Sequence, residues 1–228
     1  MMMNMLDETT PIRATEMDQL GEQLTEDCKS QGMEEAIREF LDEPFGRWMD
    51  SLAGSPAVGD GPERARGLSR NDIRMIAVAM ERAMSVRDAL LVSIVVGEDR
   101  SPREFLMDFM TNPMDPDNSR RLEEILKDSF RNASKTPDTV RCDNGVTMMF
   151  DIIEMVPERY QVQPLAVISY VLWWMGDERA MLCALRALAL DEDCSLAAIV
   201  CSAAHRHIGP AWTSGNAGNT PKGVDVGA

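Results

Sequence analysis

Apolar residues recur at helical spacing along most of the chain, and polar caps or glycine–proline pairs separate the runs. The densest run, 164–209, predicts three consecutive helices. Its first part, 165–175, is apolar on all sides, which is typical of a buried or a membrane-spanning helix. This part is shorter than the ~18 apolar residues that a membrane span needs, so we expect burial. Gly176 favours a helix end there, and Asp177 can cap the next helix.

Serine caps divide the preceding part of the chain. Ser69 with Asp72, and Ser85 with Asp88, have the spacing of capping boxes, in which the two side chains bond each other's backbone N–H groups. No alternating strand pattern of useful length appears, so the predicted fold class is all-α, a compact multi-helix domain of stacked helical hairpins with disordered termini. We expect helices over 69–84, 85–96, 101–111, 119–132, 144–156, 165–175, 178–190 and 195–207.

The N-terminal quarter is more polar and only weakly periodic. Residues 1–31 are expected to be mostly disordered, and Pro44 is expected to divide the following apolar pattern into two short helices. A glycine- and proline-rich stretch follows and predicts a linker. The predicted organisation is an acidic, partly disordered segment with short amphipathic helices at 1–60, a linker at 61–68, a helical domain at 69–210 and a disordered tail at 211–228.

Charge excludes some classes of partner. The net charge is −15, and residues 1–60 hold 14 acidic and 4 basic residues, which is −10 of that total. A nucleic-acid-binding protein would need a basic surface, and an anionic membrane would repel this chain, so neither partner is expected. The acidic segment favours solubility, or alternatively an arm that engages a basic partner or imitates a nucleic acid.

Cysteine usage and the N-terminus indicate a compartment. The five cysteines are scattered and odd in number, and the short apolar start of the chain is followed at once by acidic residues rather than by a secretion signal. We therefore expect free thiols in a reducing cytoplasm.

Two family resemblances lie in the apolar C-terminal run. The stretch Gly176–Asp191, with Ala180 and Ala187, resembles the second half of a tetratricopeptide repeat, whose helix pairs serve as protein-binding scaffolds. Residues 164–210, with Trp173 three residues before Gly176, resemble the C-terminal part of a bacterial, mainly actinobacterial, family known as domain of unknown function 4192. That family has no established activity, so the resemblance implies a helical fold and no mechanism.

One constellation suggests a metal. Cys194, Cys201 and His205 fall along one edge of a helix, and thiolate and imidazole are ligands that Zn²⁺ prefers. The chain has no Cys-x-x-Cys pair, however, and a buried cysteine commonly behaves as a small apolar residue. We therefore expect no bound metal, no cofactor and no catalytic residue.

Three residues are candidates for contacting a partner. Trp173 and Trp174 are adjacent, about 100° apart around a helix, so a thin helical stack would leave one of them exposed. Arg87 is the third candidate, as an anchor for a carboxylate; its neighbour Asp88 is not expected to face it. The sequence favours a non-catalytic protein–protein interaction module with an unidentified protein partner. An acidic inhibitor or nucleic-acid mimic acting through 1–60 is the alternative, and a metal-dependent enzyme comes third; the oligomeric state stays open.

Overall fold

The computed structural model describes residues 10–54 and 67–215. Within these two ranges the chain forms ten α-helices, two short 3₁₀ helices and no β-strand, which confirms the predicted all-α fold class. The α-helices are α2 (Ala14–Gln31), α3 (Met33–Ala53), α4 (Arg70–Arg82), α5 (Met84–Val95), α6 (Arg103–Thr111), α7 (Pro116–Arg131), α8 (Thr139–Met155), α9 (Val162–Met175), α10 (Arg179–Leu190) and α11 (Ser195–His205).

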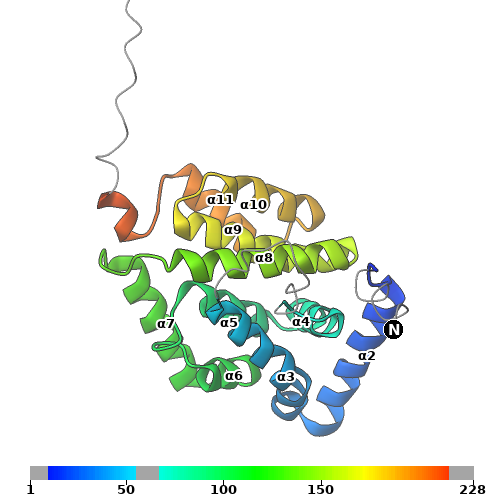
Figure 1. Cartoon of the computed structure of the whole chain (residues 1–228). Helices are drawn as coiled ribbons and strands as arrows, with labels where there is room; N and C mark the ends of the chain where they lie inside the picture. The colour runs from blue at the N-terminus through cyan, green and yellow to red at the C-terminus, as the bar shows by residue number, and fades with distance from the viewer. Residues whose placement is uncertain (1–9, 55–66, 216–228) are drawn as a thin grey trace, which may run out of the picture.

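The helices are layered on both sides of α8. Figure 1 shows α9, α10 and α11 gathered on one side of this long helix, with α3 to α6 on its other side. The apolar helix α9 lies innermost in its group, with ten of its fourteen residues buried. None of the helices in the described ranges has the length and apolar character that a membrane crossing demands.

The expectation of a partly disordered segment at 1–60 is wrong for residues 10–54. These residues form two long helices, and the side chains of Met17, Leu24 and Trp48 are buried in the same apolar core as those of α4 to α11. Each helix carries a single apolar face among charged residues, and that face becomes stable only when tertiary packing covers it. The helical core is therefore not confined to 69–210.

Pro44 lies inside α3 and does not divide it. A proline in a helix interior removes one backbone hydrogen bond and costs about 3 kcal/mol or more. Phe45, Trp48 and Leu52 follow Pro44 on the buried face, and burying such side chains contributes about 1.5–3 kcal/mol each. Their packing outweighs the local preference for a break.

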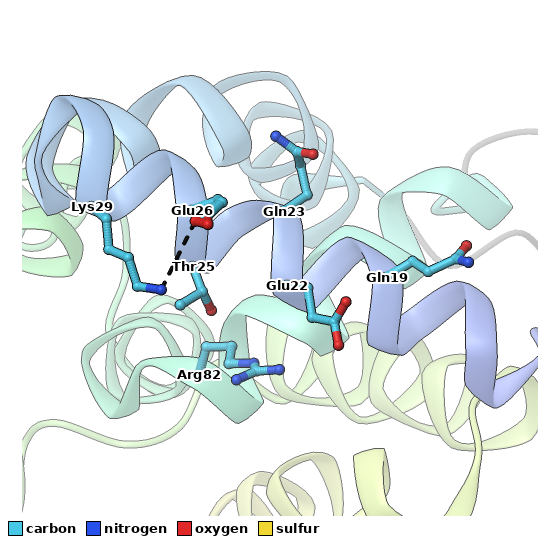
Figure 2. Close-up of a pocket in the computed structure, with 7 residues that line it drawn as sticks. All are labelled: Gln19, Glu22, Gln23, Thr25, Glu26, Lys29 and Arg82. Atoms are coloured by element: carbon cyan, nitrogen blue, oxygen red, sulfur yellow. Dashed lines mark ion pairs between the residues drawn. The ribbon is translucent and has the colours of Figure 1, made fainter.

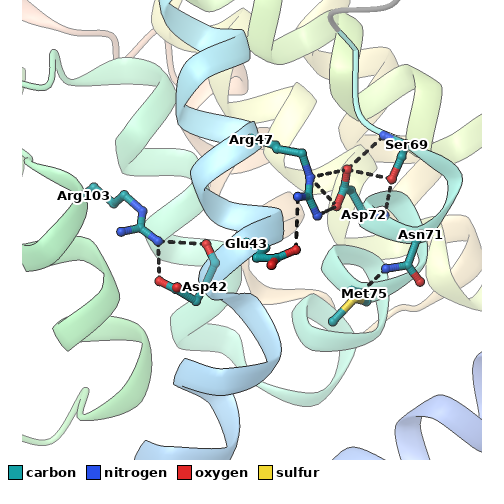
Figure 3. A network of polar contacts seen from close by, with 8 residues as sticks. All are labelled: Asp42, Glu43, Arg47, Ser69, Asn71, Asp72, Met75 and Arg103. Atoms are coloured by element: carbon teal, nitrogen blue, oxygen red, sulfur yellow. Dashed lines mark hydrogen bonds and ion pairs between the residues drawn. The ribbon is translucent and has the colours of Figure 1, made fainter.

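The predicted capping box at the start of α4 is confirmed and carries an additional ion pair (Figure 3). Asp72 accepts hydrogen bonds from the Ser69 backbone N–H at 3.0 Å and from the Ser69 hydroxyl at 2.8 Å. Arg47 of α3 also donates to this fully buried carboxylate, from Nε at 2.9 Å and from Nη2 at 2.5 Å. Burial by itself raises the pKa of Asp72, but these hydrogen bonds outweigh it, and the net shift lowers the pKa.

The capping box predicted at Ser85 is wrong. The helix begins one residue earlier, at Met84, and the Ser85 hydroxyl donates instead to the carbonyl of Met110 at 2.8 Å. The Asp88 carboxylate accepts hydrogen bonds from Arg87, as described below. The hydrogen bond from Ser85 to α6 therefore replaces the predicted cap at the start of α5.

Two helices begin earlier than predicted because aspartate side chains cap their N-termini. The carboxylate of Asp115 caps α7, which begins at Pro116, and that of Asp138 caps α8, which begins at Thr139. The disordered tail expected from residue 211 is wrong at its start, because Ala211–Gly215 form a 3₁₀ helix. Most of the linker predicted at 61–68, and the tail from 216 onward, lie outside the described residues.

Candidate binding surface

Two of the three predicted partner-binding residues are buried and are therefore not placed on the surface of this structure. Trp174 is 2% exposed, and its indole lies in the core between α9 and its neighbours. Arg87 is 7% exposed and donates to the Asp88 carboxylate at 2.7 Å and to the Gln163 side chain of α9 at 3.2 Å. The side chain of Arg87 is long enough for its Nε and Nη2 atoms to reach the adjacent carboxylate, so these two sequence neighbours meet after all.

Trp173 is the predicted candidate that reaches the surface. Its ring stacks on Phe130 at a centroid distance of 5.9 Å and meets Tyr170 edge-on at 5.2 Å. Its indole N–H donates to the carbonyl of Ile208 at 2.9 Å. These contacts hold the indole in one orientation. Trp173 is half-buried and lines a surface pocket described below.

The structure does not assemble the predicted metal edge into a site. Cys194 is buried, whereas His205 is exposed. No group of three or more His, Cys, Asp or Glu side chains in the described parts of the chain is placed to hold a metal ion. Burial raises the pKa of Cys201, which favours the neutral thiol over the thiolate that a metal would require.

Burial also disfavours the thiolate form of three further cysteines. All five cysteines are free. Burial raises the pKa of Cys142 to about 12, and it raises the pKa of Cys28 and of Cys183 as well. Because the thiolate is the nucleophile, these environments do not activate sulfur chemistry.

A shallow groove of about 490 Å³ runs between α2 and α4 (Figure 2). Gly21 permits this close approach, because a Cβ there would lie 2.8 Å from Nη2 of Arg82. Two carboxylates and two cations line the groove; Lys29 pairs with Glu26 at 3.9 Å, and Arg82 pairs with Glu81 at 3.1 Å. Three of these four charges are thus matched within the chain, and no residue with an apolar side chain lines the groove to hold a ligand. The lining residues are Gln19, Glu22, Gln23, Thr25, Glu26, Lys29 and Arg82.

On α10 three alanines face inward while two leucines face outward. Ala180, Ala184 and Ala187 are buried, whereas Leu182 is 70% exposed and Leu185 is 53% exposed. The alanines recur at the i, i+4, i+7 spacing of one helix face, and their small side chains let α10 lie close to α9. The leucines consequently project into solvent on the opposite face.

The neighbouring helix also carries an exposed large apolar side chain. Ile199 of α11 is 60% exposed, and α11 packs against α10. Ala189 also lies exposed on the outer face of α10. We call Leu182, Leu185, Ala189 and Ile199 together the α10–α11 ridge.

A pocket of about 310 Å³ opens where α9 ends, α10 begins and α11 ends. Two polypeptide turns with left-handed residues border it: Gly176 has a φ of 76° and His207 a φ of 54°. At both turns the backbone N–H groups bond back to the preceding helix, for example Ile208 N–H to the Ala203 carbonyl at 2.9 Å. The lining residues are Trp173, Gly176, Asp177, Glu178, Ala180, Met181, Ala204, His207, Ile208, Gly209 and Thr213.

His207 occupies a backbone conformation that usually requires glycine. Left-handed φ values cost a residue with a Cβ about 1–2 kcal/mol, and such strain persists only where surrounding structure enforces it. The prediction that Gly176 ends α9 is confirmed, but no sequence signal marked His207 as its counterpart at the end of α11.

Sequence reasoning did not identify the ridge, because it did not ask which face of this helix is covered. The signal was present in the two spacings, since Ala180, Ala184 and Ala187 fall on one face and Leu182 and Leu185 on the other. Leucine is ordinarily the residue that is buried, and periodicity alone cannot show that the alanine face was selected.

Comparisons with protein-family models, with curated proteins and with solved structures return no match. The resemblances of residues 164–210 to domain of unknown function 4192 and of Gly176–Asp191 to a tetratricopeptide repeat therefore stay predictions from the sequence.

Proposed function

We propose that this protein is a non-catalytic interaction module that binds a protein partner through the α10–α11 ridge. The observation that carries the proposal is the inverted orientation of α10, with alanines against α9 and leucines in solvent. Fully burying a leucine side chain contributes about 1.5–3 kcal/mol relative to leaving it in water. The isolated chain forgoes this contribution at Leu182 and Leu185, and a partner that covers them would recover it.

The ridge is suited to binding because its backbone is already ordered. It lies on two regular helices that pack against each other and against α9. Association therefore loses little conformational entropy beyond that of the ridge side chains, which is the benefit of a preorganised surface. Exposed apolar side chains grouped on one face commonly mark such interaction sites.

The test replaces both ridge leucines by glutamine. Leu182→Gln with Leu185→Gln preserves size, helix propensity and net charge while removing the apolar contact. Met114→Gln serves as the matched control, because Met114 is 87% exposed in the turn between α6 and α7, far along the chain from the ridge. Proteins that co-purify with the tagged full-length chain are then compared among wild type, the ridge variant and the control.

We expect at least one specific partner to lose affinity by about 30-fold or more in the ridge variant, since loss of an interface hot spot costs about 2 kcal/mol or more. The control should retain that partner, and thermal unfolding should show both variants folded. If every co-purifying protein binds the ridge variant and wild type equally, the proposal is wrong.

The acidic segment keeps a second candidate function, that of an inhibitor acting on a basic partner. Glu34 and Glu35 lie exposed in the first turn of α3 and support this alternative. In the same assay, Glu34→Gln with Glu35→Gln should then release the partner while the ridge variant has no effect. That pattern would assign binding to the acidic segment.

A further inference from the structure

We infer that the partner presents a basic amphipathic helix, which lies along the α10–α11 ridge with cationic side chains at both ends of its contact. This inference rests on the proposed function and adds the chemistry of the partner. The ridge provides the apolar contact, and the negative charges at its two ends favour a partner helix with cationic side chains over one without them.

The turn that joins α10 to α11 carries three consecutive carboxylates, Asp191, Glu192 and Asp193. Asp191 accepts a hydrogen bond from the Asp193 backbone N–H at 3.0 Å, and their position before α11 suits the positive end of that helix. Among the described residues, no lysine, arginine or histidine forms a salt bridge with any of the three. This end of the ridge therefore carries three negative charges without a cationic partner.

The opposite end of the ridge is the pocket beside Trp173. Asp177 is matched there by Arg179, whose Nη2 lies 2.6 Å from its carboxylate, and this contact holds the pKa of Asp177 below its usual range. Glu178 also lines the pocket and has no salt bridge within the described part of the chain. The helices α9 and α11 end at this pocket and α10 begins there, so the negative ends of two helix dipoles face it against the positive end of one. Carboxylate, helix C-termini and an indole ring all favour a cationic side chain.

The distance between the two acidic ends indicates how long the partner helix is and where its cationic residues lie. Helix α10 has 12 residues, so the two acidic ends lie about 18 Å apart. A partner helix of similar length can place lysine or arginine near each end and apolar residues against Leu182 and Leu185. Arg186 lies beside the ridge and disfavours a basic residue at the middle of that helix.

A second copy of the chain fits this surface poorly. Pairing α10 with its own copy brings the acidic turn at 191–193 against either the same turn or the Glu178 end, so carboxylates meet carboxylates in both orientations. Like charges placed together across an interface are unfavourable. The overall charge of −15 likewise favours a cationic partner through long-range attraction.

The test uses four synthetic peptides of about 18 residues each, roughly five helical turns. Three of them share one leucine face and differ only at the polar positions near both ends, which are all lysine in the first peptide, all glutamine in the second and all glutamate in the third. A fourth peptide has the lysine composition in an order that destroys the apolar face. Binding to the full-length protein is measured by fluorescence anisotropy at low and at high salt.

We expect the lysine peptide to bind most tightly, and the variant Leu182→Gln with Leu185→Gln to abolish its binding at both salt concentrations. Glu192→Lys with Asp193→Lys should slow its association by about tenfold at low salt, with a smaller effect at high salt. Glu123→Lys with Glu124→Lys makes the same change in net charge at two exposed positions of α7 and should alter association much less.

Three results overturn the inference. If the glutamine or glutamate peptide binds the ridge as tightly as the lysine peptide, the ridge takes helices without charge selection, and the proposed function survives. If the lysine peptide without an apolar face binds equally well, or the α7 control slows association as much as the turn variant does, the attraction is general and is not located at the ridge. If no peptide depends on the ridge while a cellular partner does, the partner is not a basic helix. A failure of the proposed function itself is seen separately, when no cellular partner depends on the ridge.

Discussion

At the scale of single residues, Asp72 shows how one side chain joins local and tertiary structure. Its carboxylate caps α4 through Ser69 and also holds Arg47 of α3. A buried carboxylate is tolerated because every hydrogen bond it accepts favours the charged form. The Asp72 carboxylate therefore both caps the N-terminus of α4 and binds α3 to α4 through Arg47.

We predict that Asp72 makes the protein sensitive to acid. Because the pKa of Asp72 in the folded chain lies below its ordinary value of 3.8, its carboxylate contributes stability that is fully present above that value. That stability is lost as the pH falls through the folded-state pKa. Asp72→Asn should destabilise the protein by about 2 kcal/mol at neutral pH, less than for a fully buried pair because Arg47 is half-exposed.

Urea unfolding at a series of pH values measures this effect. The difference between wild type and Asp72→Asn should narrow once the pH drops below 3.8. Glu43→Gln is the matched control, because Glu43 pairs with the same Arg47 at 3.3 Å but is well exposed, and such pairs contribute little. If the difference in unfolding free energy between wild type and Asp72→Asn stays constant across the pH series, Asp72 does not stabilise the protein through its charge.

At the scale of helices, side-chain size at the contacts decides which face points inward. The alanines of α10 let it lie against α9, and the larger residues on its other face form the ridge. Gly145 of α8 plays a similar part against α5, since a Cβ at this position would lie 2.6 Å from Cγ1 of Ile94. Small residues thus determine how closely these helices approach.

Alanine at Gly145 should destabilise the protein although alanine favours helices. Overpacking a tight contact costs about 1–3 kcal/mol, which exceeds the roughly 1 kcal/mol that alanine contributes over glycine in a helix. Gly46→Ala in α3 is the control, because its Cβ would lie 3.8 Å from the Arg103 side chain, an ordinary contact distance. Thermal unfolding should show Gly145→Ala lowered in Tm and Gly46→Ala raised. Equal shifts in both variants would mean that α5 and α8 separate without cost.

At the scale of the whole molecule, α3 connects the N-terminal and the C-terminal parts of the core. Trp48 is fully buried, and its indole N–H donates to the Ser93 hydroxyl of α5 at 2.9 Å. Arg103 of α6 reaches back to Asp42 of α3 as well (Figure 3). The helices before and after the predicted linker therefore share one core.

Replacing Trp48 tests whether the core is shared. Trp48→Ala should lower the stability of the entire chain by about 3–5 kcal/mol and preserve a single unfolding transition. Trp48→Phe retains most of the apolar area and should cost clearly less. Circular dichroism and tryptophan fluorescence should report the same midpoint for each variant. If Trp48→Ala instead separates an early transition from an unchanged late one, residues 69–210 form an independent domain, as the sequence suggested.

The sequence by itself determined the features that depend on neighbours within a few residues. Helical spacing predicted the all-α class, Ser69 predicted a cap with Asp72, and Gly176 predicted the end of α9. These predictions succeed because a cap, a left-handed turn or a helix face is defined by side chains one turn apart.

Only the tertiary structure decided which helix faces are covered and which local preferences are overruled. Pro44 stays inside α3 because distant side chains pack around it, and Ser85 leaves its predicted cap for Met110 on another helix. Trp174 faces the core while Leu182 faces water, although both are apolar residues on predicted helices. The physical reason is that burial depends on partners far along the chain, and periodicity cannot identify those partners.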